Sequence, residues 1–388
     1  MNSSISSSKG HPFKKYLITY SALMGMAVLA LIPNYLFLRN SGELLSLSKV
    51  VDIQCSSPFN VIYGTALHDI TFFYKQHLFD RLKPEIAGLG SSRMMLLRKE
   101  FFKIPFVNMG GTMGSFTQGL VVAEKMTGSG RNLKTVLIGI DFWWFNEKLN
   151  HTFQTTEPQQ LTFKKLLTPF TWIYEGKVTA GDYFRMASPF YDSSNKKQIG
   201  ILANKTGSGF GSDGSYFYSN AFIGGKYSSK QISIFVDMAK KGTSRFLFSD
   251  KMDSPSFEAF MKLLKFFKSK NINVVVFLTP VAPSVAKEMN ASGNFKYIED
   301  MKKSFDNNKI KYYDFLDVSS MGATDSEFYD GIHGSELTYC RILDSLCKNE
   351  KSLSETVDLN QVRKYLDNPD MVNSLPHKRN KSQKDASH

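Results

Sequence analysis

The sequence predicts a three-layer α/β fold in which helices cover both faces of a five-stranded parallel sheet. Five short runs along the chain consist mainly of apolar residues, as expected of strands that are buried on both sides. Segments with the periodicity of amphipathic helices alternate with these runs. Serines, glycines and acidic residues directly follow several runs, and the carboxyl ends of parallel strands are where such sheets place their sites.

The predicted strands occupy Glu85 to Leu89, Pro105 to Met109, Leu133 to Ile140, Asn273 to Leu278 and Ile310 to Phe315. Between and after them, helices are predicted at Met94 to Phe102, Phe116 to Met126, Phe257 to Lys268 and Ser335 to Leu346. In the third of these helices Phe260, Leu263, Leu264 and Phe267 recur on one face, which is the spacing of a helix packed on a sheet.

A membrane anchor is predicted before the sheet. The stretch from Leu17 to Leu38 has no charged side chain and would span roughly 33 Å as a helix, enough to cross a bilayer. Lys9, Lys14 and Lys15 precede it, which predicts a cytoplasmic N-terminus and an exported remainder. A cleaved signal peptide is the alternative; the length of the stretch and the lack of a small-x-small site after it favour an uncleaved anchor.

These patterns divide the chain into a basic cytoplasmic tail (1–15), a transmembrane signal anchor (16–38), a connector with helical stretches (39–84) and an α/β domain (85–350). Residues 142–250 interrupt the alternation and are predicted to be an insertion, either a lid or substrate platform or a unit with its own small core. This insertion holds all three tryptophans, Trp143, Trp144 and Trp172, and a Gly/Ser-rich segment at 207–214. Residues 351–388 form a C-terminal extension whose basic end, from Pro376, is predicted to be disordered.

Charge and cysteine content narrow the function classes. The chain of 388 residues carries a formal net charge of +13, which indicates either a basic soluble surface or an anionic partner such as phospholipid or an acidic glycan. No nucleic-acid-binding motif is present in the sequence, so nucleic acid is not a predicted partner. Cys55, Cys340 and Cys347 do not follow a metal-ligand pattern, and the last two, about 10 Å apart along a helix, are too distant for a disulfide. All three are interpreted as structural, and no metal or other cofactor is predicted.

Two short motifs carry the chemical signal. Gly90-Ser91-Ser92-Arg93 places serines at a junction of strand and helix, where a serine either caps the helix or acts as a nucleophile. Tyr329-Asp330-Gly331-Ile332-His333 places an Asp three residues before a His in a late loop. Their joint occurrence on a parallel-sheet pattern favours a nucleophilic system. In that system Ser92 attacks a carbonyl, His333 takes its proton and Asp330 orients the imidazole.

With these motifs the chain resembles the SGNH (GDSL-type) hydrolase superfamily, over roughly Glu85 to Leu346 without the insertion. The resemblance implies a flavodoxin-like sheet and identifies Ser92 as the nucleophile, His333 as the base and Asp330 as its partner. Ser91 stands where the family usually has Asp.

The resemblance also implies an oxyanion hole formed by backbone amides. Asn108-Met109-Gly110-Gly111 looks like the second block of the family, in which a glycine amide donates to the oxyanion together with the amide of Ser92. Gly110, Gly111 and Gly114 are all candidates for that glycine, because spacing does not separate them.

The third block departs from the family pattern. The family has Gly-x-Asn-Asp there, with Asn as an oxyanion donor, whereas this chain has Gly139-Ile140-Asp141. Loss of one such donor typically lowers the rate by roughly 100- to 1,000-fold. Arg93, or an amide of the glycine-rich region, is a candidate substitute, and Arg93, Asn108 and Asp141 are the residues expected to shape the site.

The overall layout is similar to membrane-anchored SGNH-like proteins of bacterial envelopes, such as the teichoic-acid D-alanylation protein DltD and the alginate O-acetylation proteins. This similarity implies a single-pass protein of the bacterial inner membrane with a periplasmic domain. The implied function is serine-dependent transfer or hydrolysis of an acyl ester, most simply O-acetyl, on an envelope polysaccharide, with a multi-pass membrane acyltransferase as a possible partner. The alternative is a non-catalytic SGNH-like protein that binds or assembles polysaccharide and has lost turnover.

Overall fold

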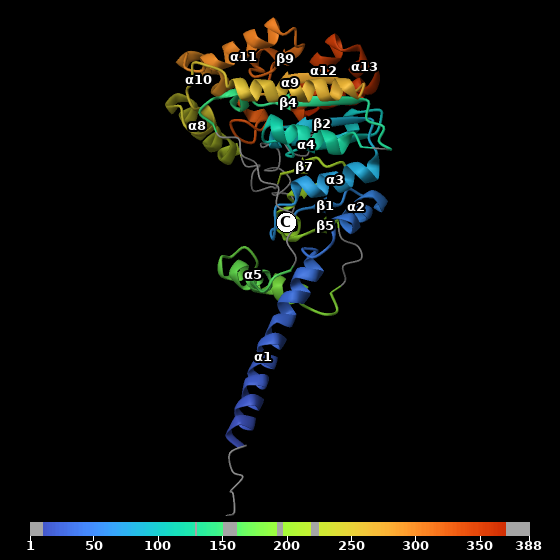
Figure 1. Ribbon diagram of the computed structural model, residues 1–388, viewed down its shortest axis with the longest axis vertical. Coiled ribbons are helices and arrows are strands. Elements are labelled where there is room, and N and C mark those ends of the chain that lie inside the picture. Colours follow the sequence, from blue (N-terminus) through green and yellow to red (C-terminus); the bar gives the residue numbers. More distant parts are fainter. Residues whose placement is uncertain (1–10, 129, 150–160, 192–196, 219–224, 370–388) are drawn as a thin grey trace, which may run out of the picture.

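The computed structural model describes residues 11–128, 130–149, 161–191, 197–218 and 225–369. The basic end of the chain, for which disorder is predicted, lies outside these residues. Figure 1 shows a globular α/β part from which one long helix, α1 (His11–Ser41), projects.

The main sheet contains the five predicted strands, which are confirmed. They are β2 (Ile86–Gly90), β3 (Phe106–Gly110), β4 (Thr135–Ile140), β8 (Asn273–Leu278) and β9 (Tyr312–Asp314). All neighbours are parallel, in the order β3-β2-β4-β8-β9. Every side chain of β2, β3 and β4 is buried, which explains why these runs do not alternate between apolar and polar residues. The strand order changes direction at β2, so the crevice of this sheet lies at the carboxyl ends of β2 and β4.

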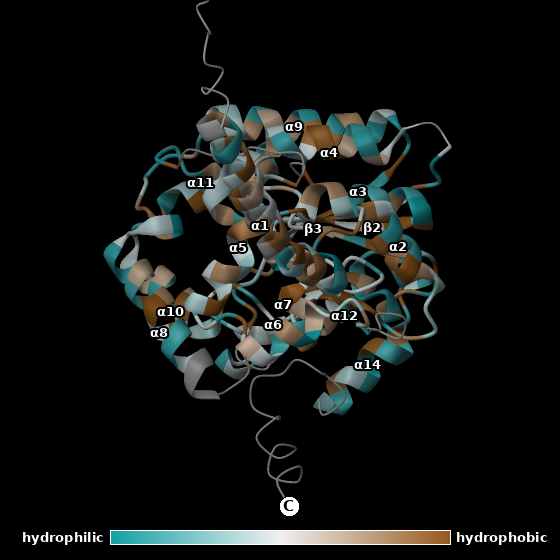
Figure 2. Cartoon of the chain, turned by 90° about the horizontal axis from the view of Figure 1, so that it is seen from below, coloured by the Kyte–Doolittle hydropathy of each residue, from teal (hydrophilic) through white to brown (hydrophobic). Residues whose placement is uncertain are grey.

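Helices cover both faces of the sheet, as predicted for a parallel α/β fold. One face carries α4 (Phe116–Met126), α9 (Ser254–Ser269) and α11 (Lys296–Asn307), and the other carries α12 (Glu336–Asn349), as Figure 2 shows from below. Side-chain caps start two of these helices, since Ser115 accepts from the Gln118 amide and Asp253 from the Ser256 amide. Phe116 and Phe260 then join α4 to α9, with ring centroids 5.0 Å apart.

The helix predicted at Met94 to Phe102 is wrong. The segment forms two short 3₁₀ helices, η1 (Ser92–Leu96) and η2 (Lys99–Phe101), separated by extended residues. The side-chain amide of Asn108 donates to the carbonyls of Met94 and Leu97, at 2.8 and 2.9 Å. These carbonyls therefore have partners without a continued helix, and the chain can turn sharply around the end of β2.

The connector and the insertion fold together into a layer between the main sheet and α1. Its core is a second sheet of two-residue strands in the order β5-β1-β6-β7, formed by β1 (Ile62–Tyr63), β5 (Gln198–Ile199), β6 (Gly209–Phe210) and β7 (Tyr216–Phe217). Two helices of the connector, α2 (Leu47–Ser56) and α3 (Thr71–Leu82), lie beside it (Figure 1). The first residues of the insertion, η3 (Phe142–Phe145), are buried in the core of the main domain. The predicted insertion is therefore not one separate unit.

The remaining helices complete these layers. Four α-helices of the described residues belong to the insertion: α5 (Phe163–Tyr174), α6 (Ala180–Met186), α7 (Ile201–Thr206) and α8 (Gly225–Lys241). Helix α8 packs on α10 (Pro283–Ser292), and η5 (Ser244–Phe246), at the end of the insertion, precedes α9. The C-terminal part contains η6 (Ser319–Met321), η7 (Asp325–Glu327), α13 (Lys351–Thr356) and α14 (Leu359–Asp367), the last two packed on α12.

The projecting helix contains the stretch for which an anchor is predicted. Residues Phe13–Ser41 of α1 are long and apolar enough to span a membrane. Its C-terminal turns are covered by α5 and α6 around a small second core, which contains Phe37, Leu38, Trp172, Val178, Tyr183, Met186, Ala187 and Ile201.

Candidate active site

Ser92 begins η1 directly after β2, at the crevice of the main sheet. The capping role at this junction belongs to its neighbour, because the Ser91 hydroxyl accepts the Arg93 amide at 3.2 Å. The Ser92 hydroxyl instead lies 2.9 Å from Nε2 of His333. Ser91 therefore caps η1, and the Ser92 hydroxyl is left to contact His333.

His333 and Asp330 lie in the loop between η7 and α12 and contact each other closely. Nδ1 of His333 is 2.8 Å from Oδ2 of Asp330. The other carboxylate oxygen, Oδ1, accepts the backbone amides of Ile332 and His333, each at 2.8 Å. These amides fix the carboxylate in one orientation. The structure therefore brings Ser92, His333 and Asp330 together in one continuous hydrogen-bonded chain.

The electrostatics of the loop keep Asp330 ionised. Burial alone would raise the pKa of the Asp330 carboxyl, but His333 and the two backbone amides outweigh burial and hold that pKa at about 2. An ionised Asp330 accepts the Nδ1–H of His333. This leaves the lone pair of Nε2 facing the Ser92 hydroxyl, which is the tautomer that a general base requires.

Arg93 is buried beside this site and connects several of its segments. Its buried guanidinium donates from Nε to the Ile332 carbonyl at 3.0 Å, from Nη1 to Asp141 at 3.0 Å, and from Nη2 to the Pro280 carbonyl. The indole of Trp143 lies 4.9 Å from the guanidinium carbon. Each guanidinium nitrogen is thus engaged inside the protein. These contacts place Arg93 beside Ser92 and His333, and its role as a substitute oxyanion donor stays a prediction.

Asp141 follows β4 and is completely buried. Its Oδ1 accepts both Nη1 of Arg93 and, at 2.7 Å, the hydroxyl of Thr279 at the end of β8. A carboxylate has no hydrogen to donate, so Asp141 does not replace the amide that the family's Asn would supply. It serves instead as the anionic partner that makes a buried arginine tolerable under the site.

The glycine amides of the second block are also engaged inside the protein. The Gly110 amide donates to Oδ1 of Asn108 at 2.8 Å, the Gly111 amide to the Gly90 carbonyl at 2.9 Å, and the Gly114 amide to Gln118 at 2.7 Å. The prediction that Gly110 or Gly111 donates to an oxyanion is therefore corrected. Within the described part of the chain, the Ser92 amide alone of the predicted donors has no acceptor, because it opens η1.

Several residues of the site were not predicted. Thr279 could have been, since it follows the predicted strand Asn273–Leu278 directly, as Asp141 follows its own strand. Tyr339 of α12 donates its hydroxyl to the Arg93 carbonyl, and the ring of Tyr218 lies 6.2 Å from that of His333. Nothing in the local sequence distinguishes these two tyrosines from the many others in the chain.

No cluster of three or more His, Cys, Asp or Glu side chains suited to a metal ion occurs in the residues that the structure describes. Cys55, Cys340 and Cys347 are free thiols, the last two of them buried. No protein-family model, curated protein or solved structure matches the chain.

Proposed function

We propose that this chain is a membrane-anchored serine enzyme that transfers or hydrolyses an acyl ester, most simply O-acetyl, on an extracytoplasmic polysaccharide. The observation that carries the proposal is the hydrogen-bonded chain from the Ser92 hydroxyl through His333 to Asp330. These three hydrogen-bonded side chains lie at the crevice of a parallel sheet, where such folds hold their substrates.

The reaction follows from the order of the groups. Oγ of Ser92 bonds to the ester carbonyl carbon while its proton passes to Nε2 of His333. The ester C–O bond then breaks, and the departing alcohol takes that proton from His333. A glycan hydroxyl or water next attacks the acyl-serine, giving its proton to His333 and restoring the Ser92 hydroxyl. The choice between these two acceptors separates a transferase from an esterase.

The resemblance to SGNH hydrolases is part of this proposal. The sheet order and the positions of Ser92 after the first strand and His333 before the last helix support it. The anchor is a further part. We propose that α1 crosses the bacterial inner membrane with the N-terminus in the cytoplasm, because lysines precede the apolar stretch. The periplasmic domain would then meet an envelope glycan, with a multi-pass acyltransferase as a partner that could deliver the acyl group.

A second candidate function is polysaccharide binding or assembly without turnover. Two observations favour it: the amides of Gly110 and Gly111 already donate to acceptors within the protein, and Asp141 has a carboxylate where an Asn would donate. Of the predicted donors, the Ser92 amide then remains to stabilise an oxyanion. Against it stands the aligned Ser92 and His333 pair, which binding alone does not require.

Labelling with a fluorophosphonate probe separates the two candidates. The full-length protein in detergent should be labelled covalently, and the Ser92→Ala and His333→Ala variants should not. Ser91→Ala is the matched control, because it removes the adjacent hydroxyl, which caps η1, and should keep its labelling. An unlabelled wild-type protein that still binds polysaccharide would establish the non-catalytic candidate.

A measurement on cells addresses the substrate. Surface polysaccharide from cells with the wild-type gene, the Ser92→Ala gene or no gene should differ in ester-linked acyl content, and the last two should agree. Equal acyl content in all three, with labelling intact, would retain the serine chemistry and reject the proposed substrate.

A further inference from the structure

Two helices of the insertion expose large apolar side chains. Phe170 and Tyr174 of α5 are 47% and 92% exposed, and Phe184 in α6 is 71% exposed. Phe163 at the start of α5 and Phe190 after α6 are also exposed. An apolar, mainly aromatic surface of this kind is unusual on a protein face in contact with water and marks an interaction site.

This surface is held against α1 by specific contacts. Within α1, Asn34 donates to the Leu166 carbonyl of α5 at 2.8 Å and accepts the hydroxyl of Tyr183 in α6 at 2.6 Å. Six residues later, Asn40 donates to the carbonyl of Met186 at 2.8 Å. Trp172 packs with Phe37 in the small second core between the three helices. The position of α5 and α6 along the axis of α1 is therefore fixed.

That position coincides with the outer end of the apolar stretch. Arg39 is the first charged residue after it, and Asn34 lies five residues earlier, or roughly 7.5 Å along the helix axis. The described side chains of α1 from Phe13 to Leu29 are all exposed, whereas burial begins at Leu31. A helix docked at this level lies at the depth of the boundary between lipid head groups and acyl chains.

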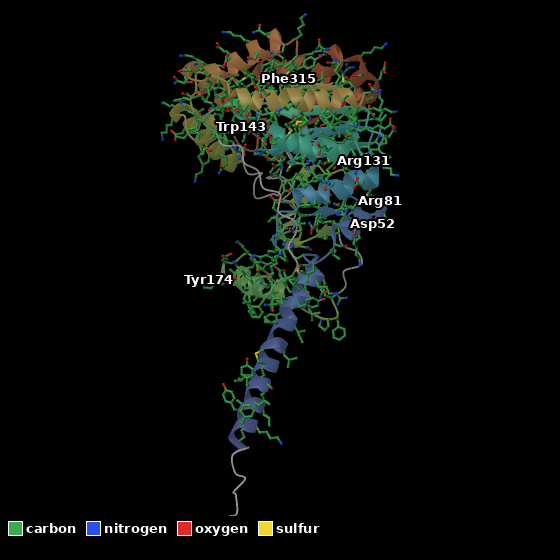
Figure 3. All side chains as sticks on the ribbon, viewed as in Figure 1. Asp52, Arg81, Arg131, Trp143, Tyr174 and Phe315 are labelled. Carbon is green, nitrogen blue, oxygen red and sulfur yellow. The ribbon has the colours of Figure 1, made fainter. Side chains whose placement is uncertain are left out.

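The apolar surface also continues onto α1 itself. Ile32 and Tyr35, at the same level as the docked helices, are 45% and 44% exposed. Figure 2 shows α5 beside α1 when the molecule is viewed along α1, and Figure 3 shows Tyr174 at the outer edge of α5. Exposed apolar side chains thus lie on both α1 and α5 at this level.

The charges of α5 and α6 suit a lipid surface. Helix α5 contains Lys164 and Lys165 and no acidic residue. In α6, the carboxylate of Asp182 is paired with both Arg185 and Lys205, at 2.8 Å each. Basic residues beside exposed aromatic side chains are typical of helices that lie in a membrane interface.

We propose that α5 and α6 form a second membrane contact, which lies in the outer interface of the bilayer that α1 crosses and binds phospholipid through Phe163, Phe170, Tyr174, Phe184 and Phe190. The inference rests on the proposed anchoring by α1 and is independent of the chemistry at Ser92. The protein would then contact the membrane through one helix that crosses it, α1, and two helices that lie in its outer interface, α5 and α6.

Contact quenching in vesicles tests this. Full-length protein with Cys55→Ser, which removes the one thiol of the three that is not buried, receives single cysteines for a fluorophore at Phe170, Phe184, Leu23 or Lys303. Each protein is reconstituted into phosphatidylcholine–phosphatidylglycerol vesicles with or without lipid that carries a nitroxide near its head group or deep in its acyl chain. Lys303 is the control, since it is exposed on α11, at the end of the domain remote from α1 (Figure 1).

Labels at positions 170 and 184 should lose roughly half or more of their fluorescence to the shallow nitroxide, as expected of a helix in the interface. The label at position 23 should respond to the deep nitroxide, and the label at 303 to neither. Quenching at 23 without quenching at 170 and 184 would overturn the second contact and leave the anchor standing. An unquenched label at 23 would overturn both. If the labels at 170 and 184 are unquenched in vesicles, and the unlabelled cysteines at these positions are shielded from thiol reagents in native membranes, a protein covers this face, which also overturns the inference.

Discussion

The guanidinium of Arg93 meets the carboxylate of Asp141 at 3.0 Å, with both side chains closed off from solvent. This pair ties the residue after Ser92 to the end of β4, and the same guanidinium holds the Ile332 carbonyl beside His333. The pair therefore positions the hydroxyl and the imidazole relative to each other.

Removal of one partner of this pair should be more damaging than removal of both. Arg93→Met or Asp141→Asn alone leaves a buried group without its partner and should lower the free energy of unfolding by about 3–5 kcal/mol. The double variant should lose clearly less than the sum of the two. These variants and the wild type form a double-mutant cycle. Chemical unfolding of the full-length protein in detergent measures the free energy of unfolding of all four proteins.

The exposed pair of Arg81 and Asp52 is the matched control for that cycle. Its side chains are 55% and 66% exposed, and Arg81→Met should change the free energy of unfolding by only about 0–1 kcal/mol. Additive losses at Arg93 and Asp141 would contradict the role assigned to their contact.

The orientation of His333 by Asp330 predicts a large kinetic effect. Asp330→Asn presents an amide to Nδ1, which favours the wrong tautomer, and should lower kcat for a chromogenic acetyl ester by roughly 10,000-fold. Asp317→Asn, at an exposed position before η6, should leave kcat unchanged. Near-normal turnover in Asp330→Asn would show that Asp330 does not orient the base.

Acid should weaken the protein through the same carboxylate. The pKa of Asp330 is lowered in the folded chain from the usual 3.8 to about 2, so its ionised form stabilises the fold above pH about 4. This contribution, about 2 kcal/mol at most, should disappear as the pH falls from about 4 to about 2. Thermal unfolding of the wild type and of Asp330→Asn between pH 6 and 2 should show their difference shrinking over that range. A difference that grows on acidification would contradict the assigned shift.

Gly139 in β4 should tolerate no side chain. A methyl group there would collide with Met94 of η1 and lie 2.8 Å from Cγ2 of Thr279. Gly139→Ala should therefore displace the turn that carries Ser92, lower the free energy of unfolding by about 1–3 kcal/mol and reduce probe labelling.

Gly181→Ala in α6 is the control for that substitution. A methyl group at Gly181 meets nothing within 4 Å, and Ala in a helix should stabilise the protein by about 0.5–1 kcal/mol. Gly139→Ala protein that unfolds and labels like the wild type would rule out the close packing around Met94.

The fold of the main domain could be predicted because each strand is local in the sequence. The runs at Ile86, Phe106, Thr135 and Asn273 are mainly apolar, and each is followed by a break. The second sheet could not be predicted, since strands of two residues such as Ile62–Tyr63 and Gln198–Ile199 have no measurable period. They exist only because the connector and the insertion meet in three dimensions.

The candidate site divides in the same way. Ser92, Asp330 and His333 belong to short motifs, so their residue types could be selected from the sequence. The partners of Gly110 and Arg93 could not, because each depends on a contact with a different segment, Asn108 in one case and Asp141 with Ile332 in the other. A motif identifies the residues of a site. Which of their donors remain free to bind a substrate depends on tertiary contacts.

The junction between α1 and the domain contains no slack. Helix α1 ends at Ser41, the Ser41 carbonyl accepts the Gly200 amide at 2.8 Å, and the Glu43 carboxylate accepts the amides of Ala66, Leu67 and Ile201. If this helix crosses a bilayer, the domain could not move freely relative to the membrane, as it could on a flexible linker. Ser92 would lie at one fixed height above the lipid surface, so under the proposed function a long polymer would have to move past it.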